Sequence, residues 1–428
     1  MPVAAHAVLI GVTGPQDQHI YGPEPDDTLF VHEMKTYTQF SAGVYEVAAN
    51  GHNNLASTSE LKFDPSGYGD LIGKLWVWNA FPAIAKTSAA TDAYYVNNLG
   101  FAALSEVGMI AGNSEILPAI NFRVLKFLYD LHAPQAREDI DPDVFRYENE
   151  SLLIQCSKAN FTTLTPIEWC FARSYAHAFP VAAFHHQSIN ITTKFRSPID
   201  FTCNAGDHTT VPVLYGTSTA LKISDVQVRL YALNILLDDI ERHVYHNADF
   251  IRPIEQYQYI DQVVTENAGK VVSINAGKLI LNHPVKCLVV GVISDDAVAG
   301  NLRVLGGVGL KDWFNYSPGH GGESLQELKL KLNGTDAHEY DLPIKIIRAR
   351  WLDAAGMRMN CHLYPIVFQP KLQDGVKSII KTVNFSRFDK TAIEFKYNGD
   401  GAGTAFVIAP NFNVMVSSGG VGGVPFRS

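Results

Sequence analysis

The stretch LYPIVFQPKLQDGVKSIIKTVNFSRFDKTAIEF, from Leu363 to Phe395, decides the fold prediction. Its apolar run Tyr364–Phe368 predicts a strand that Pro370 ends, because proline cannot donate to a strand ladder. A second run, Ile379–Phe385, and a third, Thr391–Lys396, predict two further strands. Three short strands separated by loops within so few residues indicate a β-rich fold.

A polar segment, Ser386-Arg387-Phe388-Asp389-Lys390, separates the second and third predicted strands. It places no nucleophile beside a base and holds no pair of residues with metal-ligand spacing. We therefore interpret it as a tight corner between strands, held by Arg387 and Asp389. Replacing Arg387 with Ala is then expected to lower the stability of the domain or of an assembly built from it.

Composition limits the chain to a few classes. It has 428 residues, more than the roughly 250–300 at which a single core stops growing, so two domains are expected. Charged residues make up only 18%, and the 23 Phe and 18 Tyr favour sheets with extensive contact surface. The formal charge of −9 argues against direct wrapping of nucleic acid, which requires a basic surface.

The five cysteines are odd in number and widely scattered, which predicts buried thiols in a reducing compartment. The N-terminal MPVAAHAVLIGVTG has no basic segment and a short apolar run, so we do not expect a signal peptide. No stretch reaches the roughly 18 apolar residues that a membrane span needs, and a soluble protein is expected.

Many short strands punctuated by turns fill both halves of the chain. The clearest alternation lies at 188–196, where Ile189, Ile191, Thr193 and Phe195 share one face. Similar alternation is found at 71–80, 226–233 and 405–416, and strands are also expected at 38–47, 101–110, 167–176, 257–265, 270–281, 285–293 and 325–332. Helical periodicity predicts helices at 120–131, 238–247 and 343–352 and a short helical turn at 93–98.

This pattern predicts a mainly β chain of two tandem eight-stranded jelly-roll sandwiches with short helical insertions. The expected divisions are an N-terminal arm at 1–27, a first jelly roll at 28–215, a second at 216–416 and a flexible tail at 417–428. Loops at 133–150 and 306–322 are expected on the outward surface.

Five motifs suggest chemistry at first sight, and each has a simpler interpretation. His185-His186 would point to opposite faces of a strand, and His243 and His246 have no evident third ligand. Gly399–Gly403 has no P-loop setting and predicts a hairpin loop, and Gly319–Gly322 has no nucleophile elbow nearby. The acidic residues from Asp238 are explained by a helix cap. We predict no catalytic, cofactor-binding or metal site.

As a phrase, Asn384-Phe385-Ser386-Arg387-Phe388-Asp389 resembles a motif of the major capsid proteins of nucleocytoplasmic large DNA viruses, including those of phycodnaviruses and iridoviruses. Further phrases resemble that family in the same order along most of the chain. They are Gln16-Asp17, Tyr21-Gly22, Phe30, Asp70-Leu71-Ile72, Tyr95–Gly100, Trp169–Ile191, Leu237-Asp238, Glu241-Arg242, Ile254-Glu255-Gln256, His283–Lys286, Asp312–Tyr316 and Leu332-Asn333-Gly334. Departures at 111–113 and 380–382 make the chain a divergent member.

The resemblance implies a structural role. A capsid protein of this family is expected to form a homotrimer, a pseudo-hexameric capsomer that tiles an icosahedral shell beside neighbouring capsomers and minor capsid proteins. The expected location is the virion, after assembly in the host cytoplasm, with no direct nucleic-acid contact and no membrane insertion, although an inner membrane can lie beneath such a shell. The arm at 1–25 is expected on the inner side, where it would engage neighbours or minor capsid proteins.

The alternative is a carbohydrate-binding or cupin-like jelly-roll protein, since the same fold serves lectins and cupins. That function would need an aromatic-lined groove with convergent polar groups, or a cluster of histidines and carboxylates around a metal. The mass of the protein in solution separates the two hypotheses, because a trimer favours the capsid and a monomer favours the alternative.

Overall fold

The computed structural model describes residues 37–50, 55, 59–112, 114–132, 141–147, 150–265, 271–274, 277, 279–300, 311–318, 322–337, 343–355, 362–368, 382–399 and 401–426. The chain divides into two units, Met1–Gln39 and Phe40–Ser428, and the fold described here is that of the second unit. The predicted arm at 1–27 lies outside the described residues.

The first sandwich is built from two antiparallel sheets. Sheet I has the order β1-β13-β3-β8, with β9 at its side, and sheet II has the order β2-β10-β6-β7. Their bounds are β1 Phe40–Val47, β13 Gln227–Leu237, β3 Leu71–Phe81, β8 Phe161–Ile167, β9 Phe179–Pro180, β2 Glu60–Phe63, β10 Ile189–Phe195, β6 Leu104–Ala111 and β7 Ser114–Asn121.

The second sandwich also has two sheets. In sheet III the order is β20-β17-β23, with β14 along the other edge of β23 and β16, β21 and β24 attached; sheet IV has the order β15-β22-β18-β19. Their bounds are β20 Leu363–Val367, β17 Cys287–Ser294, β23 Gly403–Ser418, β14 Phe250–Val264, β16 Pro284–Val285, β21 Val383–Asn384, β24 Val421–Gly423, β15 Val271–Ile274, β22 Thr391–Tyr397, β18 Leu325–Leu332 and β19 Thr335–Asp336.

Short helices and two small strand pairs connect these sheets. The pairs join β11 to β5 and β12 to β4. The bounds are β11 Thr202–Ala205, β5 Asp92–Tyr95, β12 Val213–Leu214, β4 Ile84–Ala85, α3 Leu99–Ala102, α4 Phe122–His132, α5 Glu150–Ser157, α6 Pro198–Phe201, α7 Asp239–Asn247, α8 Asp295–Ala299 and α9 Ile344–Ala355.

The two sandwiches have the same topology. When the accessory strands β4, β5, β9, β11, β12, β16, β21 and β24 are set aside, eight strands remain in each half. In both halves the first, eighth, third and sixth strands form one sheet, and the second, seventh, fourth and fifth form the other. Both halves are therefore jelly rolls, as predicted.

Burial follows the alternation that the sequence shows in strands with one covered face. In β3, Leu75, Val77 and Asn79 are buried, and the residues between them are half-buried. In β10, the predicted inward residues are buried and Lys194 is exposed. By contrast, every residue of β17 is buried, so sheet III is covered on both faces.

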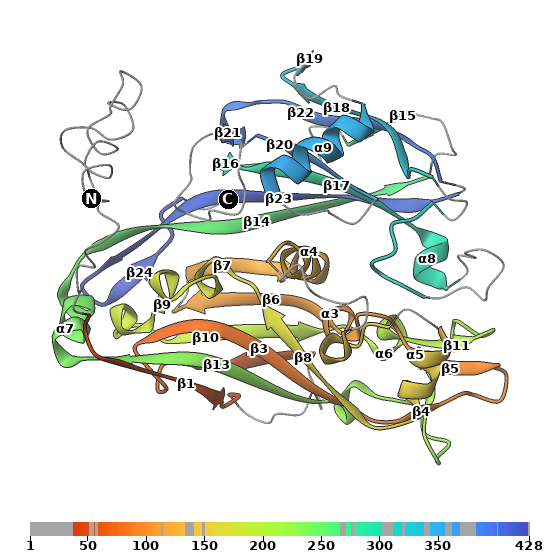
Figure 1. Cartoon of the computed structure of the whole chain (residues 1–428), viewed down its shortest axis with the longest axis horizontal. Coiled ribbons are helices and arrows are strands. Elements are labelled where there is room, and N and C mark those ends of the chain that lie inside the picture. The colour runs from red at the N-terminus through yellow and green to blue at the C-terminus, as the bar shows by residue number, and fades with distance from the viewer. Residues whose placement is uncertain are drawn as a thin grey trace, which may run out of the picture. The chain divides into compact units, whose positions relative to one another are not determined.

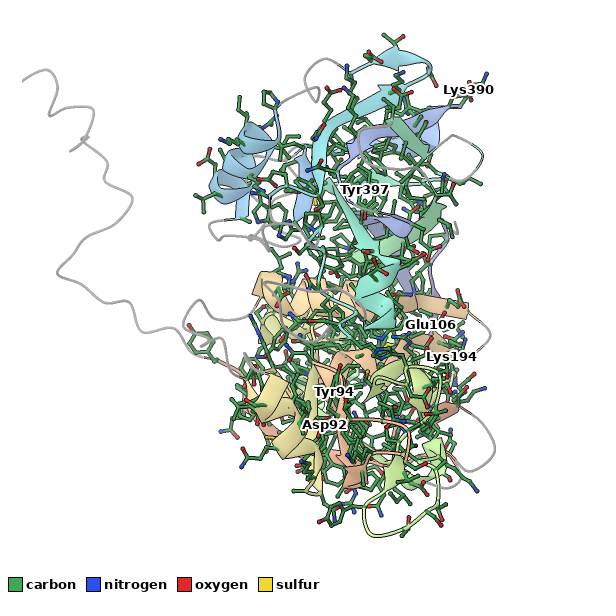
Figure 2. The ribbon with its side chains drawn as sticks, turned by 90° about the vertical axis from the view of Figure 1, so that its right-hand side faces the viewer. Asp92, Tyr94, Glu106, Lys194, Lys390 and Tyr397 are labelled. Atoms are coloured by element: carbon green, nitrogen blue, oxygen red, sulfur yellow. The ribbon has the colours of Figure 1, made fainter. Side chains whose placement is uncertain are left out.

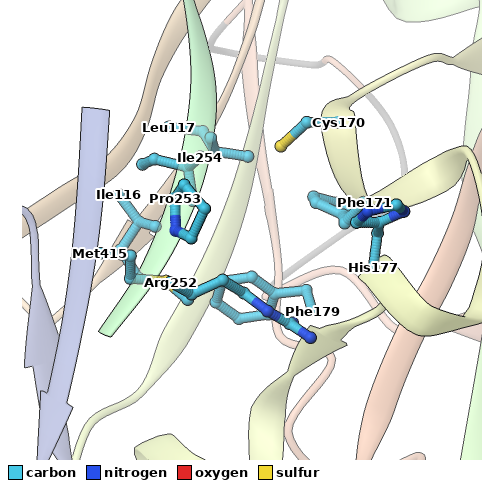
Figure 3. Close-up of a pocket in the computed structure, with 10 residues that line it drawn as sticks. All are labelled: Ile116, Leu117, Cys170, Phe171, His177, Phe179, Arg252, Pro253, Ile254 and Met415. Carbon is cyan, nitrogen blue, oxygen red and sulfur yellow. The ribbon is translucent and has the colours of Figure 1, made fainter. Parts of the chain in front are cut away.

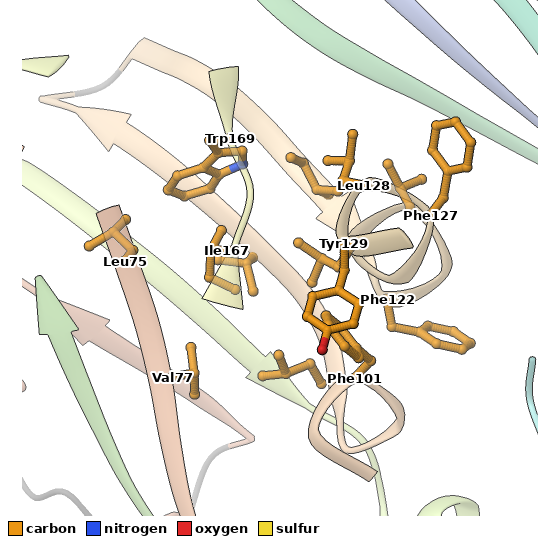
Figure 4. Close-up of a cluster of buried hydrophobic side chains, with 14 of the residues drawn as sticks. Leu75, Val77, Phe101, Phe122, Phe127, Leu128, Tyr129, Ile167 and Trp169 are labelled. Atoms are coloured by element: carbon orange, nitrogen blue, oxygen red, sulfur yellow. The ribbon is translucent and has the colours of Figure 1, made fainter. Parts of the chain in front are cut away.

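Sheet III lies between sheet IV and the first sandwich (Figure 1). One apolar core fills the space between sheets III and IV. A second, larger core fills the first sandwich and continues onto the other face of sheet III. In that core, Ile167 and Trp169 lie between Leu75 and Val77 of β3 and helix α4, and Phe127 points away from them (Figure 4).

The predicted boundary at 215/216 does not coincide with the sheets. Strand β13, at Gln227–Leu237, pairs with β1 and β3 and so completes sheet I of the first sandwich. The tail also begins later than expected, since β23 runs to Ser418 and β24, at Val421–Gly423, pairs with it.

Four local predictions were wrong. Residues 93–95 belong to strand β5 because they pair with β11, and residues 170–177 form two short 3-10 helices instead of a strand. The described residues 311–318 of the predicted outward loop are buried or half-buried. Of the predicted loop at 133–150, Val144 and Phe145 are buried in the core.

No helix in the described part of the chain is long and apolar enough to cross a membrane.

Candidate functional site

The family motif beginning at Asn384 forms a corner between sheets III and IV. Asn384 Oδ1 accepts a hydrogen bond from the backbone N–H of Ser386 (3.1 Å). The backbone N–H of His283 donates to Ser386 Oγ (2.9 Å), and that of Phe385 donates to the His283 carbonyl (3.1 Å). Phe385 is buried, and its ring centroid lies 5.9 Å from that of Phe368. The motif thus anchors one apolar side chain and satisfies the surrounding backbone.

The roles expected for Arg387 and Asp389 were wrong. Both side chains are exposed, and no ion pair joins them or ties either one to another described residue. The corner is held by Asn384, Phe385 and Ser386 instead. The sequence pattern predicted the position of the corner. The charged residues of the polar segment, however, are not the side chains that stabilise it.

The joint between the sandwiches contains a buried ion-pair network. Arg173, which follows the 3-10 helix Cys170–Ala172, donates two hydrogen bonds to Glu255 on β14 (2.9 and 3.1 Å). The Glu255 carboxylate also accepts from the hydroxyl of Tyr257 (2.9 Å) and from Lys286. Lys286 Nζ lies 4.3 Å from the ring centroid of Phe412. Every charge in the network therefore has a partner, as burial demands.

The electrostatics of this network keep it ionised. Burial by itself would raise the pKa of Glu255, but the charges of Arg173 and Lys286 and their hydrogen bonds hold that pKa well below its usual range. Burial, reinforced by the charge of Arg173, lowers the pKa of His132 to about 3, so this imidazole is neutral. Burial also raises the pKa of the Cys287 thiol to about 12.

A second ion pair joins Asp70 to the helix that follows sheet I. Arg242 on α7 donates from Nε to Asp70 Oδ1 (2.9 Å) and from Nη2 to Oδ2 (3.0 Å). Asp70 Oδ2 also accepts from the backbone N–H of Leu237 (2.8 Å). The predicted cap is confirmed, because Asp238 accepts from the N–H of Asp239. Asp70 and Arg242 come from two phrases that resemble the capsid family, and the structure brings them together.

The loop at 311–316 crosses from the second sandwich to the first. Trp313 Nε1 donates to the carbonyl of Asp200 (2.6 Å), and the Arg196 guanidinium lies 3.7 Å from the Trp313 ring centroid. Phe314 packs on Phe122 of α4 with centroids 5.8 Å apart. This segment therefore belongs to the joint and not to the outward surface.

Helix α4 covers the face of sheet III that is turned toward the first sandwich. Arg123 Nη1 donates to the hydroxyl of Tyr259 on β14 (2.6 Å), and its guanidinium lies 5.3 Å from the ring centroid of Phe406 on β23. Gly291 on β17 leaves room for that ring, since a Cβ there would lie 2.4 Å from Phe406 Cζ. One helix of the first jelly roll is thus fitted to a sheet of the second.

A small pocket remains at this joint, between β7, β14 and the segment 170–179. About 20 Å³ of it is free, enough for one water molecule. Its lining is mainly apolar, and Figure 3 shows Arg252 and His177 at its margin. Arg252 is held there by the carbonyls of Ala178 (2.7 Å) and Ala176 (3.0 Å). The pocket has no room for a sugar or a cofactor.

The remaining motifs do not form a reaction centre among the described residues. The structure brings three histidines together: the ring centroid of His185 lies 4.2 Å from that of His186 and 4.8 Å from that of His246. No group of three or more His, Cys, Asp or Glu in the described ranges has the arrangement of a metal site. The four described cysteines, Cys156, Cys170, Cys203 and Cys287, form no disulfide.

Two glycine motifs remain. The segment at 399–403 joins β22 of sheet IV to β23 of sheet III, so it is not the predicted hairpin. Gly319-His320-Gly321 lies outside the described residues.

The contacts that join the two sandwiches were not predicted from the sequence. The ion pairs among them connect residues 82 and 172 positions apart, as in Arg173–Glu255 and Asp70–Arg242. Neither local spacing nor periodicity can reveal such pairs. The one available signal was that all four residues fall within phrases that resemble the capsid family. Chemically, the arrangement fixes two sandwiches against each other and offers no nucleophile with a base.

Residues 28–238 match a family model described as "Major capsid protein N-terminus". These residues belong to the major capsid protein family. The recognition of a major capsid protein is confirmed by this match, which ends one residue beyond β13 and so agrees with the pairing of β13 in the first sandwich. A comparison with curated proteins finds no sequence match.

Solved structures support the double jelly-roll fold. A quasi-atomic model of the PBCV-1 virus capsid is similar with a TM-score of 0.73 and 18% identity, covering 94% of this chain and 100% of that chain. The Faustovirus major capsid protein is similar with a TM-score of 0.66 and 11% identity, covering 95% of each chain. The Sputnik virophage structure is similar with a TM-score of 0.54 and 11% identity, covering 97% of this chain and 93% of that chain. At these identities, the likeness establishes the fold.

Proposed function

We propose that this major capsid protein is the repeating structural subunit of an icosahedral shell, and that three chains form one pseudo-hexameric capsomer. Jelly-roll pairs of this kind are suited to tiling because each chain supplies two blocks of equal topology. Three chains then place six such blocks around one threefold axis, which approximates a hexagon.

The observation that carries this proposal is the buried joint between the two jelly rolls. A tile must keep its two blocks at a fixed angle, and here that angle is set by Arg173–Glu255–Lys286, by Trp313 and by α4. Buried ion pairs tolerate little displacement, because separating the charges leaves them unpaired in an apolar surrounding. The joint thus makes one stiff unit out of two domains.

The domain limits in this proposal follow the strand pairing. The first jelly roll extends through Leu237, the second runs from Phe250 to the end of β24, and α7 lies between them. Further partners would be neighbouring capsomers and minor capsid proteins, reached in part through the arm at 1–27. The site of action is the virion, after assembly in the host cytoplasm. The net charge of −9 fits a shell without direct nucleic-acid contact.

Light scattering coupled to size-exclusion chromatography tests the proposal. One chain has a mass of 47.1 kDa, so a trimer should elute with about 141 kDa. A monomer at every concentration up to the limit of solubility would contradict it. Expression with deletion of residues 1–27 tests the arm separately: the trimer should persist while assembly into larger shells is lost.

A further inference from the structure

The shared topology of the two jelly rolls gives each element of the first a counterpart in the second. Helix α4 follows the fifth strand of the first jelly roll, and α9 is the first described helix after the fifth strand of the second. Sheets I and III correspond in the same way, since both contain the first, eighth, third and sixth strands. Within the chain, α4 packs on sheet III through Arg123, Tyr259 and Phe406. Nothing described in the chain makes the corresponding contact of α9 with sheet I.

The outer face of sheet I carries apolar and aromatic side chains where a solvent-facing sheet would carry polar ones. The apolar part of this face comprises Val44, Trp76, Trp78, Leu164, Tyr231 and Leu233. The register places Trp76 opposite Tyr231, Trp78 opposite Leu164 and Val44 opposite Leu233. Val44 is 55% exposed and Leu164 36% exposed. An apolar face of this extent on a folded unit marks a contact surface.

The outer faces of sheets II and IV carry paired charges. On sheet IV, Lys331 pairs with Glu394 (2.7 Å), and Lys396 pairs with Glu327 (2.6 Å). Sheet II carries a similar pair at its surface, Lys194 with Glu106 (3.0 Å), seen in Figure 2. These charges are already neutralised within their own sheets, as on a solvated face. Sheet I carries one such pair, Arg229 with Glu46 (3.4 Å), and the exposed Lys74, but the centre of its outer face is apolar and aromatic.

Sheet I also repeats the local shape of sheet III. In sheet III, Phe406 lies over Gly291 of the third strand. In sheet I, a Cβ at Gly73 of the third strand would lie 3.2 Å from Leu233 Cδ2, so Leu233 covers Gly73 in the same manner. In both sheets a large apolar side chain of the eighth strand covers a glycine of the third. The surface that receives α4 in sheet III therefore has a counterpart in sheet I.

Helix α9 presents free apolar residues of its own. It packs on its own sandwich through Ile344, Ile347 and Trp351, and Trp351 also meets Phe127 of α4 with centroids 6.2 Å apart. On its exposed side, Ile346 is 46% exposed and Leu352 43% exposed, next to the exposed Lys345, Arg350 and Asp353. The helix thus has one covered side and one side without a partner among the described residues.

We infer that α9 of one chain packs on the outer face of sheet I of a second copy, repeating between chains the contact that α4 makes with sheet III within the chain. The contact is heterologous, because a helix of one copy meets a sheet of the next, and such contacts close into rings. With two jelly rolls per chain, a ring of three copies gives six nearly equivalent contacts, three within chains and three between them. This inference rests on the proposed capsomer and names the surfaces that hold it together.

Three substitutions of the same kind test the contact by light scattering over a dilution series. Val44→Glu places a charge on sheet I, and Ile346→Glu places one on α9. Each substitution should raise the trimer dissociation constant by about tenfold to a hundredfold. Ile280→Glu is the matched control, because Ile280 is 66% exposed in the second jelly roll and lies on neither surface. It should leave the dissociation constant unchanged. Far-UV circular dichroism confirms that each variant is folded.

A photo-crosslinking residue at position 44 identifies the surface that sheet I meets. In the otherwise native chain, irradiation should link it to a peptide from 344–355 of another copy. Capture of a sheet I or sheet IV peptide would overturn the inference, as would trimers of unchanged affinity in both glutamate variants; either result would leave the trimer itself standing. A wild-type chain that never forms trimers would instead overturn the proposed capsomer and this contact together.

Discussion

At the scale of single residues, the joint between the two sandwiches depends on a few buried charged side chains. Arg173 and Glu255 form a two-hydrogen-bond pair in which Glu255 is 3% exposed, whereas the pair of Arg229 and Glu46 lies at the surface. The same pair of residue types thus occurs buried and exposed in one chain. This makes the contribution of burial measurable.

Replacing Arg173 with Met is expected to lower the free energy of unfolding by about 3–5 kcal/mol, because the buried carboxylate of Glu255 loses its main partner. The control Lys194→Met should cost less than about 1 kcal/mol, since its pair with Glu106 on sheet II is exposed and screened. Chemical denaturation of both variants provides the measurement. Equal losses would show that the buried network has no special role.

Gly291 tests the fit of α4 on sheet III. Gly291→Ala is expected to destabilise by about 1–3 kcal/mol, because the new Cβ would meet Phe406 Cζ at 2.4 Å and Leu363 Cδ2 at 2.8 Å. In the control Gly67→Ala, the Cβ meets nothing within 4 Å, so the variant should be neutral or slightly stabilising. The midpoints of urea denaturation compare the two. A Gly291→Ala variant as stable as the control would refute the close packing described here.

His132 makes the joint sensitive to acid. Its pKa is about 3 in the folded chain and near 6.5 when unfolded, so between these values the unfolded state binds one more proton. Stability should therefore fall as the pH drops below 6.5, by up to about 1.4 kcal/mol per pH unit from this group. Asp312 acts oppositely below pH 6, because burial raises its pKa to about 6.

The difference between wild type and His132→Gln isolates the histidine contribution from that of Asp312. The variant should lose less stability than wild type as the pH falls from 6.5 to 5, measured by denaturation at each pH. His243→Gln, on the exposed side of α7, should follow the wild-type profile. Parallel profiles for wild type and His132→Gln would exclude this role.

At the scale of elements, prediction succeeded where one face of a strand is covered and failed where distant contacts decide. The alternation in β10 and the helical period of α4 reflect local geometry and were predicted correctly. Residues 93–95 form a strand because they pair with β11. The segment 170–177 contains two 3-10 helices instead of a strand, and Arg173 between them reaches Glu255. The partner of residues 93–95 lies more than a hundred residues away in the sequence. Periodicity within a short stretch of sequence cannot reveal such a partner.

The corner at 384–389 shows the same limit. Its position was predicted, but the charges that suggested its stabilisation are exposed, and Phe385 is the buried anchor. Phe385→Ala should cost about 3–5 kcal/mol through the cavity it leaves. Arg387→Ala should change stability by no more than about 0.5 kcal/mol. Thermal denaturation of the two variants decides between them, and a larger loss in Arg387→Ala would restore the original interpretation.

At the scale of the whole molecule, the chain is a duplicated block with one contact made internally and its counterpart left open. The large internal surface of sheet III is covered by α4, while the matching face of sheet I remains exposed and aromatic. The inferred contact would give a shell protein nearly the same geometry within and between chains. The fold and the capsid role could be predicted from the sequence, but the surfaces proposed to join the copies could be named only from the structure.

The most direct test of this account is electron microscopy of the purified oligomer, with class averages taken along its symmetry axis. The account predicts a threefold particle with six lobes of similar size, in which contacts between chains resemble the contact within each chain. A twofold particle, or a threefold particle in which sheet I faces solvent on every copy, would contradict it.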